Sequence, residues 1–416
     1  MAERLSAIAA HIAPQEASAA SKITEKHPDD VVIIGAYRTA LTKGGRGGFK
    51  DTAASDLLVG VLKGLLDRTK IDPAIIDDVA VGNVLAPGAG ATEYRAAALI
   101  AGIPYTTPVY TVNRQCSSGL MSVLQIANAI SAGTIDIGIG AGVESMSSNY
   151  GPGATSEFSE LLQGHAEAKK CQIPMGITSE NVASKYHITR VDQDEFAANS
   201  YRKAGAAQKA GRFKDEIIPL TVKFVDPKTD ESKQVVIDKD DGIRYGVTAE
   251  SLGKIKPAFS KTGSTHAGNA SQISDGAAAV LLARRSIAQQ KGLPIIGKFV
   301  DGTVVGVPPE IMGIGPAVAI PKILKRTGLS KDDVDVYEIN EAFASQALFS
   351  IQDVGIDINK VNPNGGAIAF GHPLGATGAR QIATLLSELK RSGKKIGVTS
   401  MCIGTGMGAA SVIVAE

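Results

Sequence analysis

The sequence has few cysteines and no tryptophan. Only three of its 416 residues are cysteines, at Cys116, Cys171 and Cys402. An odd and sparse set does not form a disulfide framework. No Cys-x-x-Cys pair occurs, so a zinc site of the usual spacing is not expected. These absences favour a protein of a reducing compartment.

The sequence also lacks a long apolar run and an excess of either charge. No run approaches the roughly 20 residues that a membrane span needs. The 43 basic and 42 acidic residues leave a net charge of +1, which offers no bulk attraction to nucleic acid. A hydrophobic content of 44% is typical of globular proteins, and the length predicts two or three domains. We therefore expect no membrane span and no nucleic-acid partner.

Buried strands alternate with helices from Val31 onward, which predicts an α/β fold. The run "VVIIGAYR" is apolar throughout, as in a buried strand. Residues 54–69 carry leucines and valines at helical spacing on one side. Residues 117–133, "SSGLMSVLQIANAISAG", contain no charged side chain, which predicts a helix buried on all sides.

The middle of the chain is rich in charge, and the last part repeats the layout of the first. Within the middle part, Thr189 and Asp192 predict a helix start, and Gly211 predicts its end. "TVNRQCSSGL" and "KVNPNGGAIAFGHPLGATGAR" each contain a Val-Asn strand end and a turn of small residues before a helix. This order predicts an internal duplication about a pseudo-twofold axis, with equivalent loops meeting near it. The predicted divisions are an N-terminal segment (1–28), an N-terminal half (29–146 plus 273–294), an inserted loop domain (147–272) and a C-terminal half (295–416).

Cys116 and His372 stand at equivalent turns of the two halves. Ser117 and Ser118 could cap the helix that follows Cys116, whose free N–H groups and dipole would lower the pKa of the thiol. A free cysteine is more often only a small apolar side chain, and a loop histidine is often merely solvated. The duplication nevertheless predicts that the two face each other. A Cys–His pair can generate a thiolate nucleophile.

Two further segments could support such chemistry. Cys402 lies in "MCIGTGMG", which is no dinucleotide-binding loop because no helix follows it. Its glycines leave backbone N–H groups free to stabilise an oxyanion. Asn340 begins "NEAFA" after the strand "VDVYEI". Its amide could hold a water or an oxyanion, or it could simply form a turn.

Taken in order, these motifs resemble the thiolase family, and within it the peroxisomal 3-ketoacyl-CoA thiolases. The resemblance runs from Val31 to the C-terminus and rests on "NRQCSSGL", "AGNASQISDGAAAV", "MGIGP", "NEAFA", "NGGAIAFGHPLGATGAR" and "CIGTGMG". It implies a duplicated αβαβα core of five layers with an inserted loop domain. It also implies a homodimer, possibly a tetramer.

The resemblance implies a role for each candidate residue. Cys116 would be the acylated nucleophile, His372 would take its proton, and Cys402 would act as the second acid and base. Asn340 would hold a water that forms one oxyanion hole with His372. The N–H groups of Cys116 and Gly404 would form the other hole. The reaction would be ping-pong thiolysis of 3-ketoacyl-CoA to acyl-CoA and acetyl-CoA, as in fatty-acid β-oxidation.

The resemblance also implies where substrate binds. Arg244, Ser251 and Ser271 match positions that contact CoA, and Met175 and Met312 match positions that line the acyl pocket. CoA would be a substrate, and no metal or redox cofactor would be needed.

Three other functions compete with this one. Biosynthetic acetoacetyl-CoA thiolases usually carry a histidine where this chain has Pro174, which favours the degradative branch. Carbon–carbon bond-forming synthases share the fold, but Cys402 argues against them. A non-catalytic lipid carrier would be expected to lose at least one of the three catalytic residues. Besides Pro174, the chain departs from the family at His266, where thiolases more often have Thr or Val. The sequence indicates no role for His266.

The N-terminal segment contains Arg4 and Leu5, then five residues, then His11 and Ile12. This order resembles the N-terminal import signal of peroxisomal matrix proteins, although Ile is less usual at its last position. On a helix, Arg4, Ile8 and His11 would share one face that an import receptor could bind. A frayed amphipathic tail is the alternative. The signal predicts a location in the peroxisomal matrix.

Overall fold

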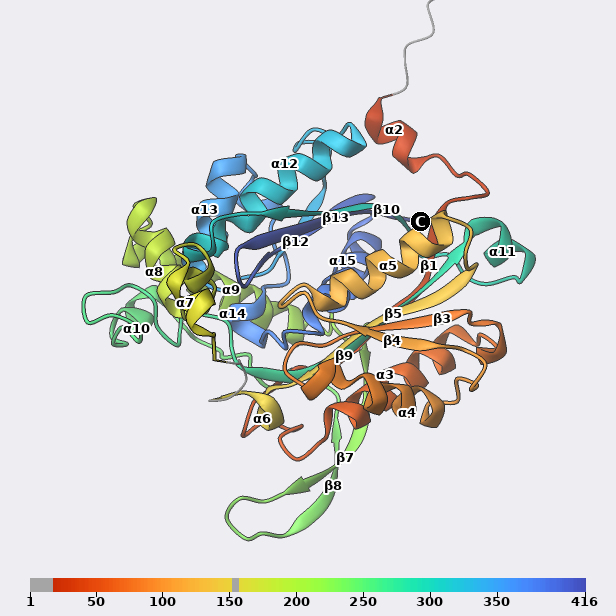
Figure 1. The fold of residues 1–416 in the computed structure, drawn as a ribbon, viewed down its shortest axis with the longest axis horizontal. Helices are drawn as coiled ribbons and strands as arrows, with labels where there is room; N and C mark the ends of the chain where they lie inside the picture. The colour runs from red at the N-terminus through yellow and green to blue at the C-terminus, as the bar shows by residue number, and fades with distance from the viewer. Residues whose placement is uncertain (1–17, 152–156) are drawn as a thin grey trace, which may run out of the picture.

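The protein forms five layers of alternating helices and sheet (Figure 1). The computed structural model describes residues 18–151 and 157–416. The predicted import signal, Arg4, Leu5, His11 and Ile12, lies outside the described residues. Residues 18–28 contain a short helix, α2 (Ala19–Thr24), that the sequence analysis does not anticipate. Ala19, Ala20 and Ile23 of α2 pack against the main hydrophobic core.

The first sheet layer follows the order β4-β3-β5-β9-β1. In this layer β3 runs parallel to β4 and β5, whereas β9 is antiparallel to both β5 and β1. All nine residues of β5 are buried, as expected of a central strand. The strands span β1 (Val31–Thr39), β3 (Asp78–Gly82), β4 (Val109–Val112), β5 (Ile137–Ser145) and β9 (Ser274–Arg284), and the two-residue strand β2 (Thr42–Lys43) also pairs with β9.

The second sheet layer repeats this pattern with the order β11-β12-β13-β10. Here β12 runs parallel to β11 and antiparallel to β13, and β13 is antiparallel to β10. The layers join at one edge, where β1 and β10 pair at Val32–Lys298 and Ile33–Gly297. The predicted duplication is therefore confirmed in the strand pairing. These strands span β10 (Gly297–Gly306), β11 (Val336–Ile339), β12 (Ile396–Ile403) and β13 (Met407–Ala415).

Helices α5 (Ser118–Ser131) and α15 (Thr377–Ser392) form the central layer between the two sheets (Figure 1). Their first turns touch directly: a Cβ on Gly119 would lie 2.5 Å from the carbonyl oxygen of Gly375. Likewise, a Cβ on Gly378 would lie 2.2 Å from the backbone nitrogen of Leu120. Only glycine permits this approach, so the loops that begin the two helices meet at the pseudo-twofold axis.

The prediction that the first of these helices is buried all round is wrong. Gln125, Asn128 and Ser131 of α5 are exposed to solvent. The helix is therefore buried along its first half and, further on, along the one face that carries Ile126, Ala127 and Ile130.

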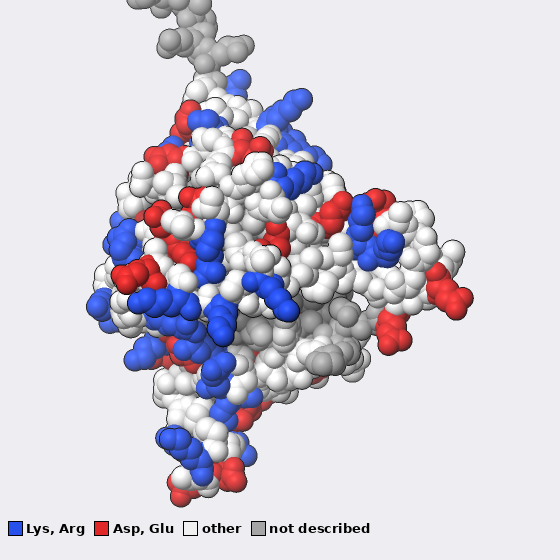
Figure 2. Space-filling model, turned by 90° about the vertical axis from the view of Figure 1, so that its left-hand side faces the viewer, with Lys and Arg blue, Asp and Glu red and all other residues white. Residues whose placement is uncertain are grey.

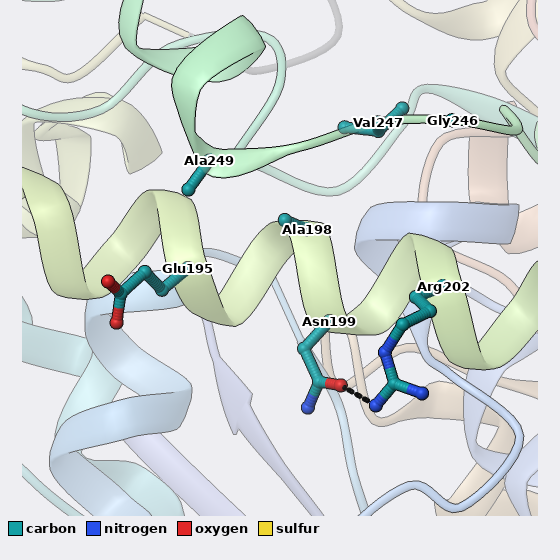
Figure 3. Close-up of a pocket in the computed structure, with 7 residues that line it drawn as sticks. All are labelled: Glu195, Ala198, Asn199, Arg202, Gly246, Val247 and Ala249. Carbon is teal, nitrogen blue, oxygen red and sulfur yellow. Dashed lines mark hydrogen bonds between the residues drawn. The ribbon is translucent and has the colours of Figure 1, made fainter.

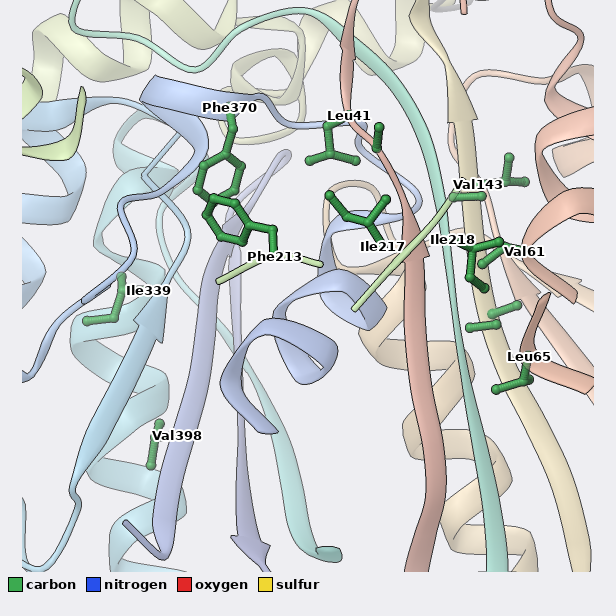
Figure 4. Close-up of a cluster of buried hydrophobic side chains, with 14 of the residues drawn as sticks. Leu41, Val61, Leu65, Val143, Phe213, Ile217, Ile218, Ile339, Phe370 and Val398 are labelled. Carbon is green, nitrogen blue, oxygen red and sulfur yellow. The ribbon is translucent and has the colours of Figure 1, made fainter. Parts of the chain in front are cut away.

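The outer layers are amphipathic helices, as predicted for residues 54–69. Helix α3 buries Leu57, Leu58, Val61, Leu62 and Leu65 against the first sheet. Beside it lies α4 (Ala91–Ile100), and the second sheet is covered by α12 (Gly315–Thr327) and α13 (Ala344–Val354). Figure 4 shows buried side chains from both halves and from the inserted segment, including the rings of Phe370 and Phe213. Helix α3 spans Ala54–Thr69. The remaining short elements of the two halves are α11 (Arg285–Gln290), α14 (Ala367–Phe370), η1 (Pro73–Ile75), η2 (Pro87–Gly90), η4 (Pro309–Ile314) and η5 (Ile358–Lys360).

The segment between β5 and β9 contains the predicted helix with its caps. Helix α9 (Arg190–Lys209) begins with a capping box between Thr189 and Asp192, and Gly211 follows its end with φ 71°. The hairpin β7–β8 projects from the body (Figure 1). No helix in the described part of the chain is long and apolar enough to cross a membrane. The other elements of this segment are α6 (Met146–Asn149), α7 (Glu160–Gly164), η3 (Ala168–Gln172), α8 (Met175–Lys185), β6 (Ile217–Ile218), β7 (Leu220–Val225), β8 (Ser232–Ile237) and α10 (Ala249–Gly253).

Candidate active site

Cys116 lies in the tight loop between β4 and α5. The residue before it, Gln115, has a left-handed backbone with φ 48°, which costs a non-glycine residue about 1–2 kcal/mol. Ser117 precedes the helix but makes no side-chain cap; its hydroxyl donates to the carbonyl of Arg114 instead. Ser118 Oγ accepts the Arg114 N–H and donates to the Gln115 carbonyl. The two serines therefore fix the loop rather than cap the helix.

Cys116 is a half-buried residue whose sulfur receives backbone N–H groups. The N–H groups of Gly404 and of Cys116 itself both point at the sulfur and favour the thiolate. Burial nevertheless outweighs them and raises the pKa of Cys116. The predicted lowering by the helix terminus is therefore not found in the resting state. The thiol must instead lose its proton to a base.

His372 has its ring held in one tautomer. Thr377 Oγ1 lies 2.6 Å from His372 Nδ1 and donates its single proton to the Pro373 carbonyl at 3.0 Å. With its proton assigned to the Pro373 carbonyl, the threonine oxygen accepts a proton from Nδ1. This leaves Nε2 with its lone pair, facing Asn340 Nδ2 at 3.3 Å. Burial, assisted by the charge of Arg380, lowers the pKa of His372 to about 3. His372 is thus an uncharged base.

Asn340 directly follows β11 and is 1% exposed. Its Nδ2 faces His372, while its Oδ1 has no hydrogen-bond partner among the described residues. A buried polar atom without a partner costs about 1–3 kcal/mol, which a bound water or substrate would recover. The side chain is therefore suited to hold a water beside His372.

Cys402 lies in β12 and is completely buried. Burial raises the pKa of its thiol, and the neighbouring Cys116 raises it further. The two sulfurs therefore share one site, and both are protonated at neutral pH. A thiol in this state is an acid that can deliver a proton to a developing carbanion.

A small apolar cluster surrounds Cys402. It contains Met312, Ala342 and Phe343, with Met175 and Ala270 packed against them. A Cβ on Gly404 would lie 3.6 Å from Met175 Sδ. The structure thus brings both predicted acyl-pocket methionines to the apolar cluster around Cys402, and Met175 also lies beside the glycine whose N–H faces Cys116.

The three residues predicted to contact CoA lie on the inserted segment and its exit. Arg244 and Ser251 are exposed, and Ser271 donates its backbone N–H to the Ala342 carbonyl at 2.9 Å. Ser271 therefore leads directly into the apolar cluster. Ser251 also closes a capping box with Thr248 at the start of α10.

A cavity of about 400 Å³ opens beside this segment, between α9 and residues 246–249 (Figure 3). Arg202 lines it and donates to Asn199 Oδ1. On the same side of the molecule, Lys and Arg side chains form a band that runs toward the β7–β8 hairpin (Figure 2). This face would attract a ligand that carries phosphate groups.

Sequence reasoning missed Glu144, a buried carboxylate in β5. Its two oxygens accept from Asn83 Nδ2 and from the N–H groups of Val84, Leu85 and Gly375. Burial raises its pKa to about 7, against the effect of these donors. Because Gly375 belongs to the loop of His372, Glu144 ties that loop to the N-terminal half. A carboxylate inside the apolar run "IDIGIGAGVES" is the signal that could have revealed it.

Thr377, which fixes the His372 tautomer, was also missed. Phe343 and Ala342 were quoted only as part of "NEAFA", without a place in the acyl pocket. His266, which the sequence left without a role, is buried and donates from Nε2 to Asp194 Oδ1 at 2.7 Å, while its Nδ1 accepts the Gly268 N–H. This contact ties α9 to the loop that leads to Ser271.

The models of two protein domains match almost the whole described chain. "Thiolase, N-terminal domain" matches residues 31–286, and "Thiolase, C-terminal domain" matches residues 293–415.

The chain belongs to the thiolase family.

Among thiolases, the chain is similar to "3-ketoacyl-CoA thiolase, peroxisomal" of Yarrowia lipolytica, with 66% identity over the full length of both chains. The enzyme of the same name from Saccharomyces cerevisiae is 55% identical, again over both full lengths. The crystal structure of the dimeric peroxisomal thiolase of Saccharomyces cerevisiae superimposes with a TM-score of 0.89 at 56% identity, covering 95% of this chain and 100% of that one. The crystal structure of human mitochondrial 3-ketoacyl-CoA thiolase superimposes with a TM-score of 0.82 at 37% identity, covering 93% of this chain and 99% of that one. The predicted family and five-layer fold are confirmed.

Proposed function

We propose that this thiolase cleaves 3-ketoacyl-CoA with CoA to give acyl-CoA and acetyl-CoA. The proposal is supported by two neighbouring thiols, by two backbone N–H groups that face the Cys116 sulfur, and by the contact between the helix starts that follow Cys116 and His372. Relatives of 66% and 55% identity that are named 3-ketoacyl-CoA thiolases support it. The alternative of a non-catalytic carrier is disfavoured because no group of this set is missing.

The first half-reaction transfers the acyl group to the enzyme. The Cys116 proton passes to His372 Nε2, and the sulfur attacks the 3-keto carbon of the substrate. The C2–C3 bond then breaks, and its electron pair becomes the enolate of acetyl-CoA. The Cys402 thiol protonates C2, and acetyl-CoA leaves. A water held by Asn340, together with protonated His372, would stabilise one negative oxygen, and the N–H groups of Cys116 and Gly404 the other.

The second half-reaction returns the enzyme to its starting state. Free CoA gives its thiol proton to the Cys402 thiolate, and its sulfur attacks the acyl carbon on Cys116. The C–S bond to Cys116 breaks, acyl-CoA leaves, and Cys116 regains its proton from His372. Each step moves a proton or an acyl group, so we propose that CoA acts as a substrate and that no further cofactor takes part.

The proposed CoA site extends from Ser271 to the basic face. Ser271 borders the acyl cluster, and Arg244 and Ser251 lie further out on the same segment. The band of Lys and Arg in Figure 2 suits the phosphates of CoA, and the cavity beside α9 leaves room for its nucleotide end. The acyl chain would lie against Met175 and Met312.

The test is product analysis with a series of 3-ketoacyl-CoA substrates of increasing chain length. Chromatography should show equal amounts of acetyl-CoA and of an acyl-CoA two carbons shorter than the substrate. The matched control is Cys116→Ala, which should release neither product while keeping its fold. Condensation of acetyl-CoA without measurable cleavage of longer substrates would favour the biosynthetic alternative.

We further propose a homodimer in which β4 pairs with its copy. One structural neighbour is described as dimeric. The outer edge of β4 pairs with no other strand of the described residues, and Leu99, Ile100 and Tyr105 on and beside the adjacent α4 are exposed apolar side chains. Such an edge invites another strand. Light scattering should give twice the chain mass of 43.0 kDa, and a fourfold mass would indicate a tetramer.

We propose that the protein is located in the peroxisome, which the names of the relatives from Yarrowia lipolytica and Saccharomyces cerevisiae support, and that it lies in the matrix. We propose that an import receptor binds the N-terminal signal formed by Arg4, Leu5, His11 and Ile12.

A further inference from the structure

Asp194 of helix α9 is a buried carboxylate that the proposed chemistry does not use. Its side chain is hydrogen-bonded through both oxygens. Oδ1 accepts from His266 Nε2 at 2.7 Å and from Asn269 Nδ2 at 3.0 Å. Oδ2 accepts from Arg190 Nε at 2.7 Å. One carboxylate therefore gathers donors from α9 itself and from the loop of residues 264–271.

Arg190 extends this contact to α10. Its Nη2 donates to the carbonyls of Leu252 and Ile255 at 3.0 and 2.9 Å, at the end of α10 and just beyond it. The cavity of about 400 Å³ lies between α9 and residues 246–249, which lead into α10, and Figure 3 shows this stretch opposite α9. The pair of Asp194 and Arg190 therefore fixes the spacing between the two walls of the cavity.

His266 and Asn269 hold the loop that leads to Ser271. A backbone N–H can only donate, so His266 Nδ1, which accepts the Gly268 N–H at 3.0 Å, carries no proton. The ring is therefore neutral and directs its one proton from Nε2 to Asp194, and burial accordingly lowers the pKa of His266. Asn269 Oδ1 accepts the His266 N–H at 2.8 Å, which closes the loop on itself.

The far end of the same loop is bound to the segment beside the acyl cluster. The Asn269 carbonyl accepts the Ala344 N–H, and Ser271 donates its N–H to the Ala342 carbonyl, both at 2.9 Å. The loop is thus held between Asp194 on one side and the acyl cluster on the other. Both parts of the proposed CoA site, the cavity wall at α10 and the loop of Ser271, are fixed to this one carboxylate.

We propose that Asp194 and His266 are positioning residues for CoA, which hold the α10 wall and the Ser271 loop at the separation that bound CoA spans. The inference rests on the proposed function for the place of CoA, and it adds which residues set the affinity for CoA. It also gives His266 a role.

The physical basis is the ordering of the site before CoA arrives. A loop that is already held in place loses little conformational entropy when a ligand binds, whereas a released loop must be ordered by the ligand, which lowers the affinity. Neither Asp194 nor His266 is assigned a contact with the reacting atoms. Releasing the loop should therefore raise the KM for CoA and leave kcat nearly unchanged.

The test is the dissociation constant of CoA, measured by isothermal titration calorimetry, together with the kcat and KM of thiolysis. His266→Phe keeps a flat ring but removes the donor to Asp194 and the acceptor of the Gly268 N–H. It should weaken CoA binding by about fivefold or more and raise the KM for CoA by a similar factor. The kcat should stay within about twofold of wild type.

Arg190→Met tests the other side of the carboxylate. The Arg190 side chain is 25% exposed, so the change leaves the buried core intact while it frees the end of α10 from α9. It should also weaken CoA binding at nearly unchanged kcat. If His266→Phe does not fold, this variant decides the test alone.

Asp192→Asn is the matched control. Asp192 lies on the same helix two residues before Asp194 and also accepts hydrogen bonds, but its carboxylate binds only Thr189 among the described residues, in the capping box. The change should weaken the start of α9 and leave CoA binding as in wild type.

The outcomes separate positioning from a general effect on stability. Wild-type affinity for CoA in the folded variants, or an equal loss of affinity in Asp192→Asn, would overturn the proposal. A fall in kcat at unchanged affinity would also overturn it. If the variants bind CoA more weakly as expected but wild type cleaves no 3-ketoacyl-CoA, the proposed function fails while this inference stands.

Discussion

Replacing Thr377 with valine should disable the base without changing the shape of the site. Valine keeps the volume and the branched form of threonine but replaces the hydroxyl by a methyl group. His372 Nδ1–H would lose its acceptor at 2.6 Å, whereas the Pro373 carbonyl would lose only its side-chain donor and keep the backbone N–H groups of Ala376 and Thr377. A buried polar group without a partner costs about 1–3 kcal/mol. The imidazole can escape this cost by moving its proton to Nε2, where it would donate to the amide oxygen of Asn340 after that amide turns, since Nδ2 faces the ring in this structure.

That change of tautomer removes the lone pair that accepts the Cys116 proton. At about 1.4 kcal/mol for each factor of ten, the cost corresponds to a rate loss of about 5- to 150-fold. The assays are the kcat for thiolysis and the rate of Cys116 alkylation, which should fall together. Thr377→Ser retains the hydroxyl and should stay close to wild type. If Thr377→Val stays within about twofold of wild type in both assays, the assigned tautomer is wrong.

Three other predictions follow from the same site and from the N-terminus. Cys402→Ser should still be acylated by substrate but should turn over much more slowly, because serine is a poor acid near neutral pH; unchanged thiolysis would remove Cys402 from proton transfer. Burial lowers the pKa of His372 from 6.5 to about 3, so between these pH values the unfolded state binds more protons than the folded state, and acid lowers the free energy of unfolding. Wild type should therefore lose about 2 kcal/mol more stability than His372→Asn between pH 7 and pH 5 in urea unfolding, and equal losses would contradict the lowered pKa. A reporter that carries the first fifteen residues should enter peroxisomes, and Arg4→Glu or His11→Glu should leave it in the cytosol; import that ignores both changes would refute the signal.

The sequence was informative about the fold wherever a pattern was local or repeated. The capping box at Thr189 and the leucine face of residues 54–69 depend on neighbours three or four residues away, and both are found. The duplication could be recognised because the order of strand, turn and helix recurs with small residues at the contacts between halves. Thus Gly119 and Gly375, which meet at the axis, both fall in motifs that the sequence had singled out.

The electrostatics of the site could not be predicted in the same way. Free N–H groups at a helix start suggested a lowered pKa for Cys116, but the burial that raises it comes from distant segments. Arg380 and Glu338 lie 42 residues apart, and no spacing rule connects them. The three exposed polar residues of α5 were missed because uncharged side chains were taken to mean burial, and what covers a helix depends on its neighbours in space.

The central claim is that Cys116 carries the acyl group between the two half-reactions. Wild type should be mixed with a 3-ketoacyl-CoA in the absence of free CoA, digested, and analysed by mass spectrometry. The acyl mass should appear on the peptide that contains Cys116 and should disappear, with release of acyl-CoA, once CoA is added. An acyl group on Cys171 or Cys402, or none on any cysteine while cleavage proceeds, would contradict the account.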